Sequence, residues 1–429
     1  MVSEGCFKKS IVGKIPCEWE ILKLKDAVDM LTDGSHFSPK EVRESKYYIA
    51  TVKNMGQFEI NLNSCKKISE YDYNRLTEAN CKPENGDVLF SKDGTMGLCF
   101  VYTQQEPIVL LSSIAIIRPD NKLDPYFLKY YISNTKMREF IVSNHSSGSA
   151  LPRLTLTNLK EIPIIRPKIQ EQKAIAKILS DLDAKIKLNQ KMNETLESIA
   201  QAIFKHWFID FEFPNEEGKP YKSSGGEMVD SELGKVPKKW AIKTLDGIAN
   251  FLNGLALQRY PAITENDYLP VIKIKEMNYG ISGSSDKASR DIPSEYIVHN
   301  GDVLFAWSGS LGVTIWCNGE GALNQHIFKI SSNEYPKWFY YEWLLYYLPN
   351  FIEIARDKAT TMGHIQRHHI SESLVAVPDS NTLEIMNNVL KLIIDRIINL
   401  KVENDTLTKT RDLFLPSLIS GKIRVPLEG

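Results

Sequence analysis

The chain has 429 residues, more than one ordinary hydrophobic core accommodates, so two or more domains are expected. Its formal net charge of -1 does not indicate a stand-alone binder of nucleic acid, because such a binder usually carries a basic domain. No apolar run approaches the ~18 to 20 residues of a membrane-spanning helix, and the first residues do not resemble a signal peptide. We therefore expect a cytoplasmic protein without a membrane contact.

Six cysteines are scattered along the chain, with no C-x-x-C pair and no spacing typical of a disulfide framework. They are Cys6, Cys17, Cys65, Cys81, Cys99 and Cys317. We expect reduced thiols, most of them structural, and no zinc ribbon.

The sequence contains a tandem repeat of about half its length. SIVGKIPCEWEILKLKDAV (10–28) matches SELGKVPKKWAIKTLDGIA (231–249), and NGDVLF occurs at 85–90 and again at 300–305. LPRLTLTNLKEIPIIRP (151–167) aligns without gaps with MGHIQRHHISESLVAVP (362–378), and the alignment continues into the segments that follow. Such self-similarity predicts a duplicated structural unit.

Each copy begins with a domain of mixed secondary structure, at 1–168 and 231–380. Short apolar runs such as DVLFS and DVLFAW predict strands, because they are rich in Val, Leu and Phe and lie between glycine turns. The aromatic segments YFLKYYIS and WFYYEWLLYYL have helical length. The fold class predicted for the chain is therefore α/β, mixed α+β, with two similar globular domains.

Each copy ends in a segment with a heptad stripe of apolar residues, which predicts long helices at 169–208 and 381–416. We expect the helices to pair as an antiparallel coiled coil, and a helix of ~38 residues spans about 57 Å. Asn193 and Asn404 occupy equivalent positions and are predicted to meet, or nearly meet, near its middle. The alternative is that each stripe packs on its own domain. The predicted pairing residues are Leu182, Ile186, Asn193, Leu196, Ile393, Ile397, Asn404 and Leu407.

The remaining segments are a linker at 209–230, rich in Gly, Pro, Ser and Glu, and a tail at 417–429. Two similar domains on a spacer of fixed length would suit duplex DNA, whose grooves repeat every ~34 Å.

Several motifs together carry a family resemblance. They are G-K-x-P-x-x-W, NGDVLF, WFIDFEFP followed by YKSSGGEM and SELGKVP, and the terminal LFLPSLISGKI. With the half-chain repeat, this combination resembles the specificity (S) subunit of type I restriction-modification systems over essentially the whole chain.

The resemblance implies a non-catalytic subunit whose two target recognition domains bind the two halves of a split DNA site. The paired helices would set the gap between the half-sites and dock two modification subunits. Those methyltransferases would carry S-adenosylmethionine, and restriction subunits in the same assembly would use ATP and Mg. No cofactor is expected on this chain.

Candidate DNA-binding residues lie in the loops that differ between the copies, and they have the side chains that contact bases and phosphates. In the first copy they are Ser35, His36, Phe37, Lys53, Asn54, Lys92, Ser147 and Arg153. In the second copy they are Gln258, Arg259, Lys273, Lys275, Trp307, Ser308, His364, Gln366 and Arg367. For each of them, an ordinary solvated loop residue is the competing interpretation.

No catalytic motif is present: the sequence lacks an adenine-methylase NPPY or DPPY, a phosphate loop and a nucleophile elbow. In HIQRHH, His364 and His368 are four residues apart, but no Cys or carboxylate nearby completes a metal site. SKDGTMG is better explained as a turn after a strand than as a phosphate cradle. The alternatives that stay open are a fused restriction or methylation enzyme and a coiled-coil scaffold that does not bind DNA.

Overall fold

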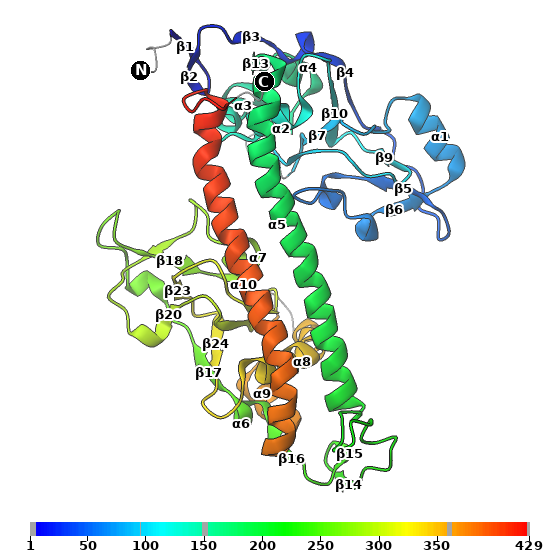
Figure 1. Cartoon of the computed structure of the whole chain (residues 1–429), viewed down its shortest axis with the longest axis vertical. Helices are drawn as coiled ribbons and strands as arrows, with labels where there is room; N and C mark the ends of the chain where they lie inside the picture. Colours follow the sequence, from blue (N-terminus) through cyan, green and yellow to red (C-terminus); the bar gives the residue numbers. More distant parts are fainter. Residues whose placement is uncertain (1–5, 95, 148–152, 358–362, 427–429) are drawn as a thin grey trace. The chain divides into compact units, whose positions relative to one another are not determined.

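The computed structural model describes residues 6–94, 96–147, 153–357 and 363–426, and the chain forms two compact units (Figure 1). One unit consists of Met1–Lys187 and Leu407–Gly429, and the other of Leu188–Thr406. The two long helices, α5 (Ile169–Phe204) and α10 (Ser380–Ile419), each contribute to both units. The units are described one at a time.

The first unit is built on a four-stranded sheet with the order β4-β10-β7-β8, whose paired strands are antiparallel. A second sheet, β6-β5-β9, contains a parallel pair, β5 with β9. The strands are β1 (Phe7–Ser10), β2 (Gly13–Pro16), β3 (Glu20–Lys23), β4 (Val28–Asp33), β5 (Tyr47–Ala50), β6 (Lys66–Ile68), β7 (Val88–Ser91), β8 (Cys99–Val101), β9 (Ile108–Leu110), β10 (Ile114–Pro119), β11 (Ser146–Ser147), β12 (Arg153–Leu154) and β13 (Pro163–Arg166). The helices before α5 are α1 (Glu70–Glu78), α2 (Pro125–Ser133), α3 (Thr135–His145) and α4 (Leu156–Lys160), with 3-10 turns η1 (Leu24–Asp26), η2 (Val52–Asn54) and η3 (Leu62–Ser64).

The second unit repeats this topology. Its four-stranded sheet has the order β17-β24-β21-β22, and its second sheet, β19-β18-β23-β20, again contains one parallel pair, β18 with β23. The strands are β14 (Met228–Ser231), β15 (Gly234–Pro237), β16 (Ala241–Thr244), β17 (Asn250–Asn253), β18 (Leu269–Ile272), β19 (Lys287–Ala288), β20 (Ile297–Val298), β21 (Val303–Ala306), β22 (Gly312–Ile315), β23 (Gly321–Leu323), β24 (Ile327–Ser331) and β25 (Leu374–Val377). The helices are α6 (Leu245–Ile248), α7 (Ile274–Tyr279), α8 (Lys337–Asp357) and α9 (Arg367–Ser371), with 3-10 turns η5 (Leu257–Arg259) and η6 (Ser294–Tyr296) and a π-helical turn η4 (Lys205–Ile209).

The matching sheet orders confirm the mixed α/β class and the repeat. Both NGDVLF motifs form the start of a central strand, β7 or β21, which is fully buried because the sheet is covered on both faces. The SKDGTMG segment leads from β7 to its antiparallel neighbour β8, so it is a strand-to-strand connection, as predicted.

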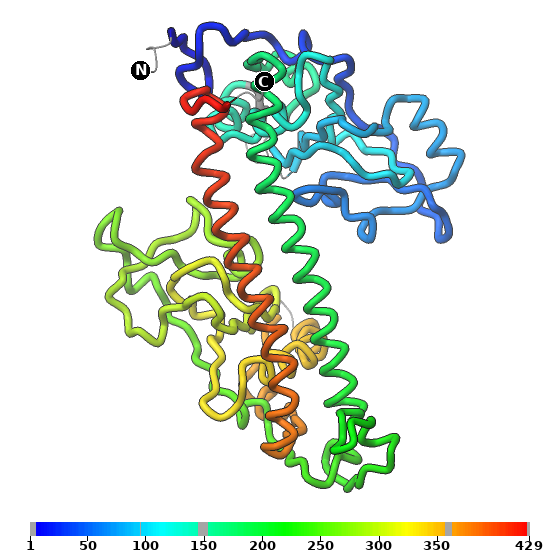
Figure 2. The backbone as a smooth tube through the Cα atoms, viewed as in Figure 1, coloured from blue at the N-terminus to red at the C-terminus, as the bar shows by residue number. Residues whose placement is uncertain are grey.

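The long helices pack against each other and against the globular parts, so both predicted arrangements of the heptad stripes occur. In the second unit, the end of α5 and the beginning of α10 lie side by side (Figure 2). Ala200 and Phe204 of α5 share one hydrophobic core with Leu390 and Ile394 of α10 and with α8. In the first unit, the beginning of α5 packs with the end of α10, including Leu179 and Leu418. Within each unit the two helices are antiparallel.

The polar contact between the helices differs from the prediction by one helical turn. Asn189, and not Asn193, donates through Nδ2 to Oδ1 of Asn404 at 2.9 Å and to Oε2 of Glu403 at 2.9 Å. Asn193 is buried one turn further along, and its Oδ1 has no hydrogen-bond partner among the described residues. Asn193 and Asn404 occupy equivalent positions of the repeat, but they do not form this contact. Which residues meet in an antiparallel helix pair also depends on where the two helices cross.

The other predicted pairing residues lie on the packed faces of their helices, except that Ile394 takes the buried position predicted for Ile393. Ile186 and Ile397 are buried, and Leu196 and Ile393 are half-buried against the core of the second unit. Ile394 lies deeper than Ile393. Leu182 and Leu407 are half-buried in the first unit.

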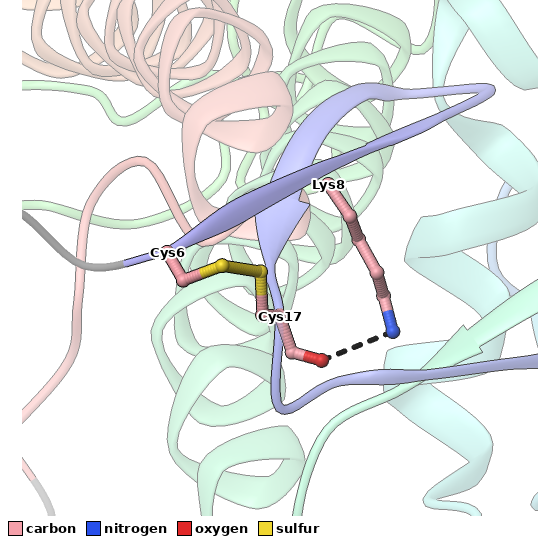
Figure 3. Close-up of a disulfide and its surroundings, with 3 residues drawn as sticks. All are labelled: Cys6, Lys8 and Cys17. Carbon is pink, nitrogen blue, oxygen red and sulfur yellow. Dashed lines mark hydrogen bonds between the residues drawn. A yellow bond between two sulfur atoms is a disulfide. The ribbon is translucent and has the colours of Figure 1, made fainter.

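Cys6 and Cys17 form a disulfide at the open end of the β1–β2 hairpin, contrary to the expectation that all thiols are reduced (Figure 3). Phe7 pairs with Pro16, so the flanking cysteines are brought opposite each other with Cα atoms 5.4 Å apart. Lys8 donates through Nζ to the carbonyl oxygen of Cys17 at 3.1 Å. The spacing of the two cysteines in the sequence does not predict this disulfide, because the register of the β1–β2 hairpin determines which residues lie opposite each other.

Candidate nucleic-acid interface

In the first unit, four segments converge beside the ends of β4 and β7. After β4, Gly34 donates its backbone N–H to the carbonyl of Ile114 at 3.1 Å, and Ser35 donates to that of Leu110 at 2.7 Å. After β7, Lys92 donates to the carbonyl of Ser113 at 2.8 Å and accepts from the N–H of Leu154 at 3.1 Å. The loops after β4 and β7, the β9–β10 connection and strand β12 therefore form one cluster.

The second unit contains the same cluster with the same backbone register. Gly254 and Leu255 donate to the carbonyls of Ile327 and Leu323 at 3.1 and 3.0 Å. Trp307 donates to the carbonyl of His326 at 3.3 Å and accepts from the N–H of Ile365 at 3.1 Å. The two loop clusters thus hold their segments by equivalent hydrogen bonds.

A glycine is required at the same place in each cluster, because the chain passes very close to a neighbouring carbonyl. A Cβ on Gly34 would lie 2.2 Å from the backbone oxygen of Leu110, and one on Gly254 would lie 2.2 Å from that of Asn324. Neither distance is tolerated by non-bonded atoms, so substitution at either glycine must move the backbone.

The two loop clusters carry different side chains at equivalent positions. In the first unit, Lys92 Nζ lies 2.5 Å from Oδ2 of Asp33, and His36 Nε2 lies 3.7 Å from the same oxygen. In the second unit, the equivalent contact is a hydrogen bond from Nε1 of Trp307 to Oδ1 of Asn253 at 3.0 Å. A buried ion pair in one domain is therefore replaced by an indole–amide contact in the other.

Further polar side chains gather around each cluster. Arg153 Nε lies 3.1 Å from Oδ1 of Asp93 in the first unit. In the second unit, Ser308 Oγ and His326 Nδ1 are 3.1 Å apart, and the ring of Trp307 lies 6.0 Å from that of His326 and 6.5 Å from that of His364. Arg153 and His364 are exposed at equivalent positions of the repeat.

Some predicted residues have a structural role. Lys92 is only 5% exposed and is neutralised by Asp33, which weighs against direct contact with a base. Asn54 is buried, accepts from the N–H of Thr51 at 2.8 Å and donates to the carbonyl of Ser64 at 2.7 Å. Lys53 beside it is exposed. The backbone of Ser147 pairs with Arg153 in β11–β12.

The other predicted residues of the second unit are divided between separate places. Gln258 and Lys273 line a cavity of about 260 Å³, in which Lys273 forms an ion pair with Asp286. Lys275 donates to Oγ of Ser284 at 3.0 Å, and Arg259 is exposed on η5.

Gln366 is the N-cap of α9, and Arg367 is its first residue. Gln366 donates its backbone N–H to Nδ1 of His369 at 3.0 Å, and Arg367 donates to the carbonyl of Phe251 at 3.1 Å. His364 precedes α9 and His368 lies within it, so the two do not share a helical face. The structure as described contains no group of His, Cys, Asp and Glu side chains arranged to hold a metal ion.

Sequence reasoning missed part of each cluster. Ser112 and Ser113 in the first unit are replaced by Gln325 and His326 in the second, at the turn before β10 or β24. The signal was present in the aligned stretches IVLLSSIAI and GALNQHIFK, in which both serines are replaced by larger polar residues. Phe37 is half-exposed beneath the guanidinium of Arg75, 4.4 Å from its ring centre, and Arg75 was also missed.

Comparison with known proteins decides the family. The sequence profile described as the type I restriction modification DNA specificity domain matches residues 16–198 and again residues 237–409. The chain belongs to this family. It is a specificity subunit, the component that recognises the DNA target in type I restriction-modification systems.

Relatives of this specificity subunit cover most of its length. It is 28% identical over 445 residues to the MjaIX specificity subunit of Methanocaldococcus jannaschii, covering 98% of this chain and 96% of that one. It is 24% identical to the HindI specificity subunit of Haemophilus influenzae, over 79% of this chain and 87% of that one. The crystal structure of an S subunit from M. genitalium has the same fold, with a TM-score of 0.54, 16% identity and coverage of 96% and 97%. No helix within the described ranges has the length and apolarity to cross a bilayer.

Proposed function

We propose that the two loop clusters each recognise one half of a split DNA site. The observation that carries this proposal is that equivalent backbone hydrogen bonds present different exposed side chains, Arg153 in one unit and His364 in the other. A backbone arrangement that occurs twice with different side chains suits a protein that must bind two different short sequences in a fixed order.

The chemistry of the exposed side chains supports a division between base and phosphate contacts. The exposed side chains of Arg153 and His364 can hydrogen-bond to base edges in the major groove, whereas Ser35 is buried and its Oγ donates to the carbonyl of Phe37 at 2.8 Å. The exposed cations Lys53 and Arg259 are suited to phosphate contacts, which position a protein on DNA without specifying sequence.

The assembly around the chain is proposed on the same basis. We infer that α5 and α10 dock two modification subunits, and that these carry the S-adenosylmethionine while restriction subunits use ATP and Mg. The chain itself is then non-catalytic, and its near-neutral charge is explained because its partners supply much of the phosphate contact.

The test uses the matched pair Arg153→Ala and His364→Ala in the complex with the modification subunit. Each variant is expected to relax discrimination by about 10- to 100-fold in its own half-site and to leave the other half unchanged. Competition binding with single-base variants of the target measures this. Equal weakening on all DNA would mean that these residues contact phosphate only, and methylation by the purified chain alone would show that it is an enzyme.

A further inference from the structure

The loop after β4 exposes a phenylalanine beside the first loop cluster. Phe37 is 52% exposed, whereas phenylalanine is among the residues most often buried. Its backbone is fixed, because Oγ of Ser35 accepts from the N–H of Phe37 at 3.0 Å and donates to its carbonyl at 2.8 Å. Ser35 in turn donates to the carbonyl of Leu110 at 2.7 Å and accepts from the N–H of Ser112 at 2.9 Å. Phe37 is therefore held at the loop cluster by hydrogen bonds.

An arginine covers one face of this ring. The guanidinium carbon of Arg75 lies over the ring, 4.4 Å from its centre, which is within the range of a cation–π contact. Arg75 belongs to α1, whose Tyr73 and Leu76 share a hydrophobic core with the second sheet of the unit. A terminal nitrogen of Arg75 also lies 3.3 Å from Oδ1 of Asp72. The contact with α1 supports the ring from one side, while half of the side chain stays exposed.

The equivalent residue of the second unit is buried. Counted from the equivalent glycines Gly34 and Gly254, Phe37 corresponds to Leu257. Leu257 is 5% exposed and lies in a hydrophobic core with Leu269 of β18. The same place in the loop therefore carries a core residue in one unit and an exposed aromatic ring in the other. Such a difference is expected of a residue that serves only one half-site.

The chemistry of the major groove limits what this ring can contact. The base edges there present polar groups together with one apolar group, the 5-methyl group of thymine. An aromatic ring gains free energy by burying apolar surface, so the methyl group is the contact that suits it. Apolar side chains also bind DNA by insertion between base pairs, but insertion requires both faces of the ring, and Arg75 covers one of them.

We propose that Phe37 recognises the 5-methyl group of a thymine in the half-site bound by the first unit, with Arg75 as the residue that positions the ring. The inference rests on the proposed function, because it places the first loop cluster in the major groove. It assigns one base of one half-site. Because Leu257 is buried, the second unit makes no equivalent contact.

The test is competition binding by the complex with the modification subunit, on the target found by mapping methyladenine. Each thymine of the duplex is replaced in turn by deoxyuridine, which lacks only the 5-methyl group. The wild type should bind about 3- to 5-fold less tightly when one thymine of one half-site is replaced, as for the loss of one buried methyl group. Phe37→Ala should bind the thymine and deoxyuridine duplexes equally. A wild type that is indifferent to every replacement overturns the inference, and so does a full methyl effect in Phe37→Ala.

Two further variants separate the roles of the ring and the arginine. Phe7→Ala removes a phenylalanine of similar exposure, 48%, from the β1–β2 hairpin, and it should keep the full methyl effect. Arg75→Lys keeps the charge but loses the planar group, so it should reduce the methyl effect and leave binding to unrelated DNA unchanged. A full methyl effect in Arg75→Lys would show that Arg75 does not position the ring.

The same experiment distinguishes this inference from the proposed function. If the wild-type complex shows no preference for the target over unrelated DNA, the proposed function fails, and the inference fails with it. If the target is preferred but Phe37→Ala only lowers the amount of modification subunit that co-purifies with the chain, Phe37 belongs to a protein interface, and the inference alone is wrong.

Discussion

Gly34 and Gly254 are the residues on which the two loop clusters most directly depend, because a side chain at either would meet a backbone carbonyl 2.2 Å away. We expect Gly34→Ala and Gly254→Ala each to destabilise its own unit by about 1 to 3 kcal/mol. Each should weaken recognition of one half-site only. Thermal unfolding and binding to half-site variants measure the two effects.

Gly283 provides the control for this pair. A Cβ placed there has no atom within 4 Å, so Gly283→Ala should leave stability and binding unchanged. If Gly34→Ala behaves like Gly283→Ala, the loop after β4 does not need the close approach that the structure shows.

Glu342 gives the second unit a pH-dependent stability. It is 2% exposed in α8, its Oε2 has no hydrogen-bond partner among the described residues, and burial, with a smaller contribution from the charge of Glu197, raises its pKa to about 8. Between the ordinary pKa of a glutamate and about 8, the folded unit binds more protons than the unfolded chain. The free energy of unfolding therefore falls as the pH rises through this window, by at most about 1.4 kcal/mol per pH unit.

The measurement is the midpoint of thermal unfolding between pH 5 and 8 for the wild type and Glu342→Gln. The amide keeps the shape and does not ionise, so the variant should be more stable than the wild type at pH 8 and should show a weaker pH dependence. The same slope in both proteins would assign the effect to other groups.

At the scale of elements, the helix pair combines an apolar seam with one amide contact. We expect Asn189→Ala to destabilise the second unit by about 1 to 2 kcal/mol, because Asn404 loses a hydrogen-bond partner in the half-buried seam. Asn193→Ala is the matched substitution one turn away, and it should cost less because the Oδ1 that it removes has no hydrogen-bond partner in the part of the chain that the structure describes. Thermal unfolding compares the two, and the opposite order would favour the pairing predicted from the sequence.

The elements also show what the sequence could and could not predict. The heptad stripes and the turn-bounded run DVLF predicted α5, α10, β7 and β21, because a periodic apolar face or a buried strand depends on local pattern. The partner of Asn404 was missed by four residues because the crossing point of two helices depends on packing elsewhere. Lys92 was expected on the DNA-binding surface, but its partner Asp33 lies 59 positions away in the sequence. The helices and central strands were therefore predictable from the sequence. The long-range contacts that decide whether a side chain is exposed or buried were not.

At the scale of the whole molecule, the duplication is the central feature. Both units conserve the sheet order and the hydrogen bonds of the loop cluster, and they differ in the side chains around it. Because α5 links the first domain to the second along the chain, its length should contribute to the gap between half-sites. Deleting seven residues from α5 and seven from α10 removes about 10 Å of helix from each, and the gap should change while both half-sites stay the same. An unchanged gap would contradict this role of the helices.

The measurement that tests the account most directly is a map of methyladenine in the DNA of cells that express the chain with its modification subunit. We predict a split motif in the wild type, a change confined to one half with Arg153→Ala, and a change confined to the other half with His364→Ala. A continuous motif, or a change in both halves from either substitution, would contradict the proposal that each unit recognises its own half of the target.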